Sequence, residues 1–490
     1  MEMQDRSFFE STTPQSEPLR FSTKLAYGLG EIARSATATL HNFFLLFFLT
    51  NAAGLNPTLA GTILLISNIW DVINRPLIGW LSDRTRSRWG RRRSWMIVSA
   101  VPFGIFFLLT WVVPGFSQDN HLNQNALFWY YATVIFLFNT AFMAIALPHS
   151  ALAPELTQNY DERTSLISFQ SAFSVGTSIL SLVLAQAIFT SVPNSRAKYL
   201  FLGSVCAVIS VVAIYGCVWG TRRRTATKPE PDSQQANSAA LSFRSQLRLV
   251  FTNGPFLYVI GIYLCSWLTM QITGALLPYA IVDEMRLSDK AVTQVAIVSQ
   301  VTSLLMMLVW NALRQRVGKR AIYLMGIPFW LVAQVGIAFL QPGQIGWIYW
   351  LAVMSGVGGS AALLVPWSML PDVIDLDELN SGQRREGIFY GFVGQFQQIA
   401  LAIALFLIGK SLDWSGFVPT VAGQPTPTQP DAAIFAIRLL FGLVPAVVLF
   451  AGMVLTYFYP ITREVHAEIL LKLRERKSSY IHQLAAMDKI

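Results

Sequence analysis

The chain has 490 residues, of which 53% are hydrophobic and only 13% are charged. A soluble domain carries roughly one quarter charged residues, so this composition excludes an ordinary soluble enzyme or binding module. The three cysteines lie inside apolar stretches, which predicts packing rather than a disulfide framework or a metal site.

Apolar stretches follow one another along almost the whole chain, separated by short polar breaks. About 20 apolar residues span the hydrocarbon layer as a helix. A transmembrane barrel would instead show alternating segments of about ten residues. We therefore predict an all-α membrane protein with twelve transmembrane helices, at 24–50, 59–81, 95–116, 127–153, 166–190, 198–220, 249–282, 291–312, 321–341, 344–369, 387–411 and 432–459.

The net charge of +9 follows the expected topology. Basic residues crowd alternate breaks, at 84–93, 222–248 and 314–320, whereas 117–126 contains no Lys or Arg. By the positive-inside rule, both termini are expected in the cytoplasm of a multi-pass protein of the plasma (inner) membrane. The polar stretch 1–20 lacks the pattern of a signal peptide, so the first span is expected to direct insertion.

A polar segment divides the spans into two sets of six. We predict an N-terminal bundle at 1–220, a cytoplasmic linker at 221–248, a C-terminal bundle at 249–459 and a cytoplasmic amphipathic tail at 460–490. The expected apolar stripe of the tail consists of Val465, Ile469, Leu470 and Leu473.

Two short patterns recur about half a chain apart. Pro148 and Pro366 each begin a proline-containing, acidic segment at the end of a span, and basic residues follow both Gly90 and Gly318. Repeated six-helix halves with a central site between them are typical of secondary transporters.

Three long motifs occur in order: WDVINRPLIGWLSDRTRSRWGRRRSW (70–95), PHSALAPELTQNYDERT (148–164) and PWSMLPDVIDLDELNSGQRREGIFYGF (366–392). Together they resemble the glycoside–pentoside–hexuronide:cation symporter family of the major facilitator superfamily, which includes bacterial melibiose carriers and vertebrate lysolipid carriers. The resemblance extends from KLAYGLGE (24–31) to YPITREVHAEI (459–469). It implies two six-helix bundles, in the major facilitator fold, that rock around a central site.

The resemblance places a cation site on the second span, built from two carboxylates one turn apart with an asparagine between them. Asp71 and Asn74 match, whereas Arg75 stands where the second carboxylate would be. Offsets of three and four residues place these side chains on one helix face, so an Asp71–Arg75 ion pair is expected. A pair that only holds helices together is the alternative. No cofactor is expected; the co-transported cation can be H⁺ or Na⁺, and the permanent charge of Arg75 argues against Na⁺.

Other polar residues of the spans are candidates for substrate binding: Glu31, Arg34, Ser35, His149, Gln170, Trp267, Gln271, Tyr390, Gln395 and Gln398. In the resemblance, Ser35 stands where sugar-transporting relatives hold an aspartate, and Gln398 stands where they hold a lysine. Aromatic and amide groups suit a sugar or glycoside. An unpaired Arg34 or Arg75 instead suits an anion such as a hexuronate or a lipid phosphate. The alternatives are a packing role for His149, helix bridging for Gln170 or Gln271, and an internal ion pair between Glu31 and Arg34, which are three residues apart.

Charged residues at the ends of the spans are expected to form gates, as in the superfamily: Asp83, Arg84, Arg91, Arg92, Glu155 and Arg163 in the first half, and Asp372, Asp375, Arg384 and Arg385 in the second. For the arginines of 84–93, a topology signal or the binding of anionic lipid headgroups is the alternative.

The sequence therefore predicts a secondary active transporter and no enzyme, with cation-coupled symport of a sugar, glycoside or related organic solute by alternating access. The alternatives are a lysolipid or organic-anion carrier without sodium coupling and a non-transporting membrane sensor. The expected partners are a small-molecule substrate and membrane lipids, with no nucleic acid, and the protein is expected to be a monomer.

Overall fold

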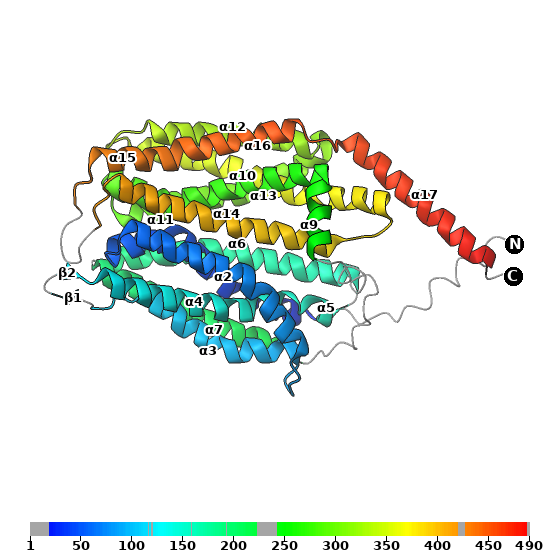
Figure 1. Ribbon diagram of the computed structural model, residues 1–490, viewed down its shortest axis with the longest axis horizontal. Helices are drawn as coiled ribbons and strands as arrows, with labels where there is room; N and C mark the ends of the chain where they lie inside the picture. Colours follow the sequence, from blue (N-terminus) through cyan, green and yellow to red (C-terminus); the bar gives the residue numbers. More distant parts are fainter. Residues whose placement is uncertain are drawn as a thin grey trace.

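The computed structural model describes residues 19–115, 117–118, 121–157, 159–192, 194–222, 243–419 and 427–487. Within them, twelve long helical segments run along one common axis (Figure 1). The first six are α1 (Phe21–Leu40) with its π-helical extensions η1 (His41–Leu45) and η2 (Phe48–Ala52), α2 (Pro57–Arg84), α3 (Arg91–Thr110), α4 (Gln124–Ser150), α6 (Tyr160–Ser191) and α7 (Ser195–Thr221). The other six are α10 (Gly254–Pro278) with η3 (Tyr279–Glu284), α11 (Asp289–Val317), α12 (Lys319–Ala338), α13 (Ile345–Ser381), α14 (Glu386–Trp414), and α15 (Asp431–Arg438) continued by η4 (Leu439–Leu443) and α16 (Val444–Tyr457).

Ten of these segments are long and apolar enough to cross a membrane on their own composition. The other two are the first two segments, which carry charged residues in their middle, such as Arg34 and Asp71. Each of the twelve predicted spans overlaps one of these helical segments, and the all-helical membrane fold is confirmed. The span predicted at 249–282 begins inside the preceding short helix (Phe243–Thr252), and the span predicted at 344–369 ends before α13 does.

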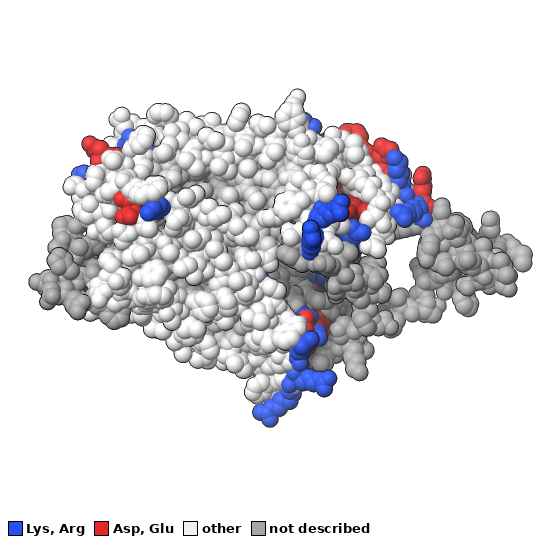
Figure 2. All heavy atoms as spheres, in the orientation of Figure 1, with Lys and Arg blue, Asp and Glu red and all other residues white. Residues whose placement is uncertain are grey.

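The outer surface of the helices is apolar. Leu180, Val212, Leu308 and Val447 are 67%, 65%, 67% and 69% exposed, respectively. Figure 2 shows a broad band without charged side chains between two ends where Lys, Arg, Asp and Glu gather. An exposed apolar band of this kind is stable against lipid and unfavourable against water, as expected for a membrane protein.

The two ends of the molecule differ in their short elements. At one end, the hairpin end, strands β1 (Ser117–Gln118) and β2 (His121–Leu122) form a small antiparallel pair. At the other, the tail end, lie α5 (Ala153–Leu156), α9 (Phe243–Thr252) and α17 (Arg463–Met487) (Figure 1).

The predicted linker and tail each contain a helix. Within the linker predicted at 221–248, α9 begins at Phe243, while 223–242 lie outside the described residues. In α17, Ile469 and Leu473 are buried, at 4% and 7% exposed, whereas Val465 and Leu470 are 39% and 37% exposed. The helix therefore packs against α13 with only half of the predicted stripe.

The repeat between the halves is visible in the backbone. Gly90 precedes α3 with φ of 94°, and Gly318 precedes α12 with φ of 86°. Residues with a Cβ rarely adopt these angles, so glycine is required at both turns. The two basic turns recognised in the sequence thus share one conformation, and both lie at the tail end of their half.

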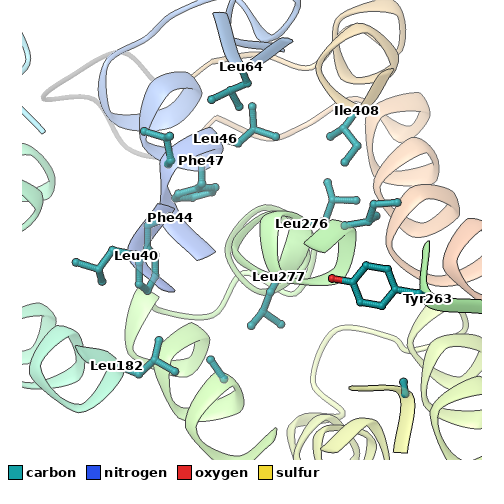
Figure 3. Packing of buried hydrophobic residues seen from close by; sticks show 14 of the residues in the cluster. Leu40, Phe44, Leu46, Phe47, Leu64, Leu182, Tyr263, Leu276, Leu277 and Ile408 are labelled. Atoms are coloured by element: carbon teal, nitrogen blue, oxygen red, sulfur yellow. The ribbon is translucent and has the colours of Figure 1, made fainter. Parts of the chain in front are cut away.

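The two halves meet along α2 and α14, α6 and α11, and η1 and α10. The α2–α14 contact is close near the hairpin end, where a Cβ at Gly409 would lie only 2.3 Å from the carbonyl oxygen of Pro57. Buried apolar residues from both halves, such as Leu64 and Leu276, belong to one continuous cluster (Figure 3).

Candidate functional site

The hairpin end is closed by side-chain contacts between the halves. Asn51 donates to Asp283 at 3.0 Å, and Thr50 and Tyr279 share a hydrogen bond of 2.6 Å. Further contacts of this kind are Asn56 and Thr58 with Asp413, Lys198 with Asp289, Thr293 with Gln186, and Gln300 with Ser178. None of these residues is among the predicted site residues, because each is an ordinary polar residue of the sequence until the fold pairs it with a residue of the other half.

The tail end differs from the hairpin end. Between described residues, every ion pair there stays within one half. Arg92 contacts Glu155 at 2.8 Å and Asp83 at 3.6 Å in the first half. In the second half, Asp372 contacts Lys319 at 2.7 Å. The hydrogen bonds and ion pairs between the halves therefore run from near the middle of the molecule to the hairpin end.

Most of the predicted gating residues belong to two clusters of ion pairs, one in each half. Arg91 contacts Glu155 at 3.0 Å, and Arg384 contacts Asp375 at 3.1 Å. Arg84 lies over the ring of Trp80 and Arg385 bonds to Gln383, while Arg163 forms no ion pair with a described residue. A gate formed by these two clusters across the halves stays a prediction.

A cavity of about 370 Å³ lies between the halves. Its walls come from α1, η1, α2 and α4 on one side and from α10 and α14 on the other. The polar and aromatic side chains that line it are Arg34, Thr37, His41, Asn42, Ser67, Asn68, Asp71, Arg75, Phe138, Asn139, Phe142, Trp267, Gln271, Gln397 and Gln398.

Arg34 is held by a buried carboxylate behind the cavity wall. It forms an ion pair with Glu31, whose side chain is fully buried while that of Arg34 is 46% exposed. Gln170 donates to the other Glu31 oxygen at 3.0 Å and accepts from Tyr27 at 3.3 Å. The expected Glu31–Arg34 pair is therefore present, and Gln170 orients Glu31 rather than lining the cavity.

Asp71 is 6% exposed, and its carboxylate accepts a hydrogen bond from a neighbouring helix instead of from its own helix. Asn139 of α4 donates to Asp71 Oδ2 at 3.4 Å, and Asn74 donates to the carbonyl oxygen of Asn139 at 3.4 Å. The remaining oxygens, Asp71 Oδ1 and Asn74 Oδ1, are buried without a hydrogen-bond partner among the described residues. Unpaired buried acceptors are costly, so these two oxygens are ready to receive a proton or a cation.

The expected ion pair between Asp71 and Arg75 is wrong in this conformation, because no nitrogen of Arg75 lies within 4.0 Å of a described carboxylate. The guanidinium instead extends toward the other half. Its Nη1 would lie 3.7 Å from a Cβ at Gly394 of α14. Arg75 thus presents a positive charge to the cavity without a contacting counterion.

The structure brings six of the predicted residues together around the cavity: Arg34, Asp71, Arg75, Trp267, Gln271 and Gln398. Ser35 donates to the carbonyl oxygen of Ser174 at 2.6 Å, and His149 stacks on Tyr27 and bonds to its carbonyl oxygen at 2.9 Å. Both serve packing between helices. Tyr390 stacks on Trp367, and Gln395 has a buried oxygen without a partner, but neither lines the cavity.

Seven polar residues of the cavity are not among the predicted site residues: Thr37, His41, Asn42, Ser67, Asn68, Asn139 and Gln397. Asn68 could have been found, because it precedes Asp71 by three residues and shares its helix face. His41 is packed against the ring of Phe138 at 4.8 Å, so its role depends on contacts that only the fold supplies.

A polar cavity between two repeated six-helix bundles, closed at one end by contacts between them, defines a membrane transporter that exposes its site alternately. Residues 26–463 match the family described as MFS/sugar transport protein. The chain belongs to this family, and the predicted secondary transporter is confirmed.

Relatives support the same class. The chain is 40% identical to an uncharacterized symporter of Synechocystis sp., over 96% of this chain and 99% of the relative. It is 27% identical to the sodium-dependent lysophosphatidylcholine symporter 1 of Mus musculus, over 95% and 91% of the two chains. It is 26% identical to the isoprimeverose transporter of Lactiplantibacillus pentosus, over 93% and 92%.

Solved structures share the fold. The nucleoside transporter NupG aligns with a TM-score of 0.60 at 12% identity, covering 90% of this chain and 99% of its own. A bacterial homologue of the iron transporter ferroportin, in an inward-facing state, aligns with a TM-score of 0.59 at 17% identity, covering 90% and 100%.

Proposed function

We propose that this protein is a proton-coupled symporter of a sugar-like organic anion, such as a hexuronate. The observation that carries the proposal is Arg75, which lines the central cavity with no carboxylate of the described residues within ion-pair distance. A guanidinium keeps its charge and binds a carboxylate through two parallel hydrogen bonds, so it suits an anionic group of the substrate.

The other residues of the cavity suit the hydroxyl groups of the same molecule. The side-chain amides of Gln271, Gln397 and Gln398 offer both donors and acceptors, and Trp267 offers an aromatic face. A sugar acid needs this combination, whereas a plain carboxylic acid needs only the arginine.

Asp71 supplies the coupling in this proposal. Its ionised carboxylate lies one turn from Arg75 and attracts the guanidinium, in competition with a substrate anion. A proton on the free Asp71 Oδ1 removes that competition, so proton and anion bind together. A proton needs one oxygen, whereas hard metal cations are surrounded by several oxygen ligands, which favours H⁺ over Na⁺.

The test is uptake of labelled glucuronate and glucose by proteoliposomes, with and without a pH gradient or Na⁺. We expect glucuronate to be preferred and its uptake to respond to the pH gradient. Arg75→Gln should lower glucuronate uptake on the order of tenfold, because one charge-assisted hydrogen bond contributes roughly 1.5–3 kcal/mol. The matched control, Arg86→Gln, changes an exposed arginine outside the cavity and should leave the preference unchanged. Equal uptake of both sugars by the wild type would contradict the proposal.

Asp71→Asn separates coupling from binding. The amide imitates a protonated carboxyl group, so exchange of glucuronate across the membrane should persist while accumulation driven by the pH gradient is lost. Accumulation that survives in Asp71→Asn would show that the proton binds elsewhere.

A lysolipid carrier is the second candidate, supported by an apolar cavity of about 130 Å³ in the second half. This cavity shares Asn42 with the polar cavity and is lined by residues such as Met270 and Phe441. A lysolipid whose headgroup lies in the polar cavity would place its acyl chain in this apolar cavity. Labelled lysophosphatidylcholine in the same uptake panel distinguishes the two: saturable uptake of the lysolipid without uptake of glucuronate would favour the second candidate.

For orientation, we propose that the tail end faces the cytoplasm of the plasma (inner) membrane and that the protein acts as a monomer. The basic breaks at 84–93 and 314–320 both lie at this end, and one chain supplies both walls of the cavity. A reporter fused after Ile490 should respond as cytoplasmic and one inserted near Asn123 as external. The reverse pattern of reporters would contradict the orientation. A dimer, measured by light scattering in detergent, would contradict the proposed monomer.

A further inference from the structure

A second polar cavity, of about 680 Å³, lies at the tail end of the second half. It forms where α11 ends, α12 begins and the chain passes from α16 into α17. The side chains considered below all line it: Arg314, Arg316, Lys319, Arg320, Asp372, Tyr459, Arg463, Glu464 and His466. None of them lines the central cavity.

The basic residues of this cavity are only partly neutralised. Lys319 is paired with Asp372 at 2.7 Å, and Arg320 lies over the ring of Tyr457 at 5.0 Å. Arg314, Arg316 and Arg463 have no described carboxylate within 4.0 Å. The remaining acid, Glu464, lies beside them at the start of α17, so basic side chains outnumber acidic ones by five to two.

Two buried donors in the same cavity have no acceptor in the part of the chain that the structure describes. Tyr459 is 2% exposed, yet its hydroxyl has no hydrogen-bond partner, and the same holds for the Nε of Arg314. Leaving buried polar groups unpaired costs free energy, roughly 1–3 kcal/mol for each group. The cost is avoided if an anion with several acceptor oxygens occupies the cavity.

The cavity also adjoins the apolar surface of the helices. Tyr457 and Phe458, which directly precede Tyr459, are 60% and 61% exposed. An anion bound beside Arg463 would therefore have lipid-facing side chains next to it. Basic pockets at the membrane surface, between the ends of helices, recognise anionic lipid headgroups.

We infer that this cavity binds the phosphate of an anionic phospholipid, with the guanidinium groups of Arg314, Arg316 and Arg463 and the hydroxyl of Tyr459 as its donors. The acyl chains lie along the exposed faces of Tyr457 and Phe458. Since Arg463 is the first residue of α17, the bound lipid fastens the start of this helix to the second half.

The test places the full chain in nanodiscs that contain equal amounts of phosphatidylglycerol and phosphatidylcholine. The protein is then released from the nanodiscs in a native mass spectrometer, which identifies the lipids that stay bound to it. The wild type should retain phosphatidylglycerol in preference to phosphatidylcholine. Arg316→Gln with Arg463→Gln should lower this preference on the order of tenfold. Arg86→Gln with Arg88→Gln removes the same charge from exposed arginines of the first half and should change the preference less than threefold, on the order of a general attraction. An equal fall in both double variants would overturn the site.

Tyr459→Phe checks the site without changing charge. Since the hydroxyl has no partner, its removal should leave the thermal stability of lipid-free protein unchanged or higher, while retention of phosphatidylglycerol falls. Lower stability with unchanged retention would mean that the hydroxyl has a structural role, against the inference.

Inorganic phosphate, added to lipid-free protein in detergent, distinguishes a headgroup from a free anion. For a lipid site, millimolar phosphate should stabilise the wild type only weakly, and phosphatidylglycerol should stabilise it strongly. Strong stabilisation by phosphate, lost in the Arg316 and Arg463 variant, with no preference for phosphatidylglycerol would overturn the lipid assignment.

Discussion

Asp413 provides the sharpest test of the closed hairpin end. It accepts hydrogen bonds from Asn56 Nδ2 at 2.7 Å and from Thr58 Oγ1 at 2.6 Å. Asn56 and Thr58 belong to the start of α2 and Asp413 to the end of α14, so both bonds connect the halves. They cannot survive a rocking motion that opens this end, and Asp413→Ala should therefore destabilise only the closed state.

The magnitude follows from the two bonds. A hydrogen bond to a charged group contributes roughly 1.5–3 kcal/mol, and the half-buried position of Asp413 lowers the contribution of each bond. The two bonds together are therefore expected to stabilise the closed state by about 2 kcal/mol. That corresponds to about a thirtyfold shift toward conformations with an open hairpin end.

The shift is measured by electron–electron double resonance between spin labels at Asn125 and Gln344. These residues are exposed at the hairpin end, one on each half, and the three native cysteines are replaced beforehand. A population with a longer distance should appear in Asp413→Ala. The control, Asp431→Ala, removes an exposed carboxylate from the same end and should leave the distances unchanged. Unchanged distances in Asp413→Ala, or the same change in both variants, would refute the reasoning.

Three further variants test local packing and gating. Gly30→Ala places a Cβ 2.4 Å from the ring of His149, so it should lower the unfolding free energy by roughly 1–3 kcal/mol in a thermal assay. The control Gly176→Ala, whose Cβ would have no neighbour within 4 Å, should not lower it. Equal melting temperatures of the two variants would contradict the packing argument. Glu31→Gln leaves Arg34 without its buried carboxylate and should lower the unfolding free energy by about 1–3 kcal/mol. The double variant with Glu31→Gln and Arg34→Gln should recover part of this lost stability. An additive loss in the double variant would show that the two charges are not coupled. Asp83→Ala removes one partner of Arg92 and should make cysteines placed in the central cavity more accessible from the tail end; unchanged labelling with normal expression would reduce the cluster to a topology signal.

The sequence alone was sufficient for much of the site. Asp71, Arg75 and Arg34 were identified because a charge inside an apolar span requires a partner or a task. Trp267, Gln271 and Gln398 were identified as polar or aromatic residues in otherwise apolar helices. Ser35 and His149 have the same appearance in the sequence, yet the structure uses them between helices of one half. Spacing along one helix cannot tell the face toward the cavity from the face toward a neighbouring helix.

What the sequence by itself determined is the membrane fold, since the length of each apolar stretch, the glycines at the basic turns and the repeated motifs are local properties of the chain. The Glu31–Arg34 pair follows from spacing along one helix, whereas tertiary structure decided the partner of Asp71. Asp71 is bonded to Asn139 and not to Arg75, because α4 packs against α2 at that height and supplies a closer donor. Tertiary structure also decided which end is closed. Asp413 and Asn56 are separated by more than half of the chain, and they meet only because the two halves come into contact there. Such pairings depend on the relative position of distant helices, a position that no local pattern in the chain encodes.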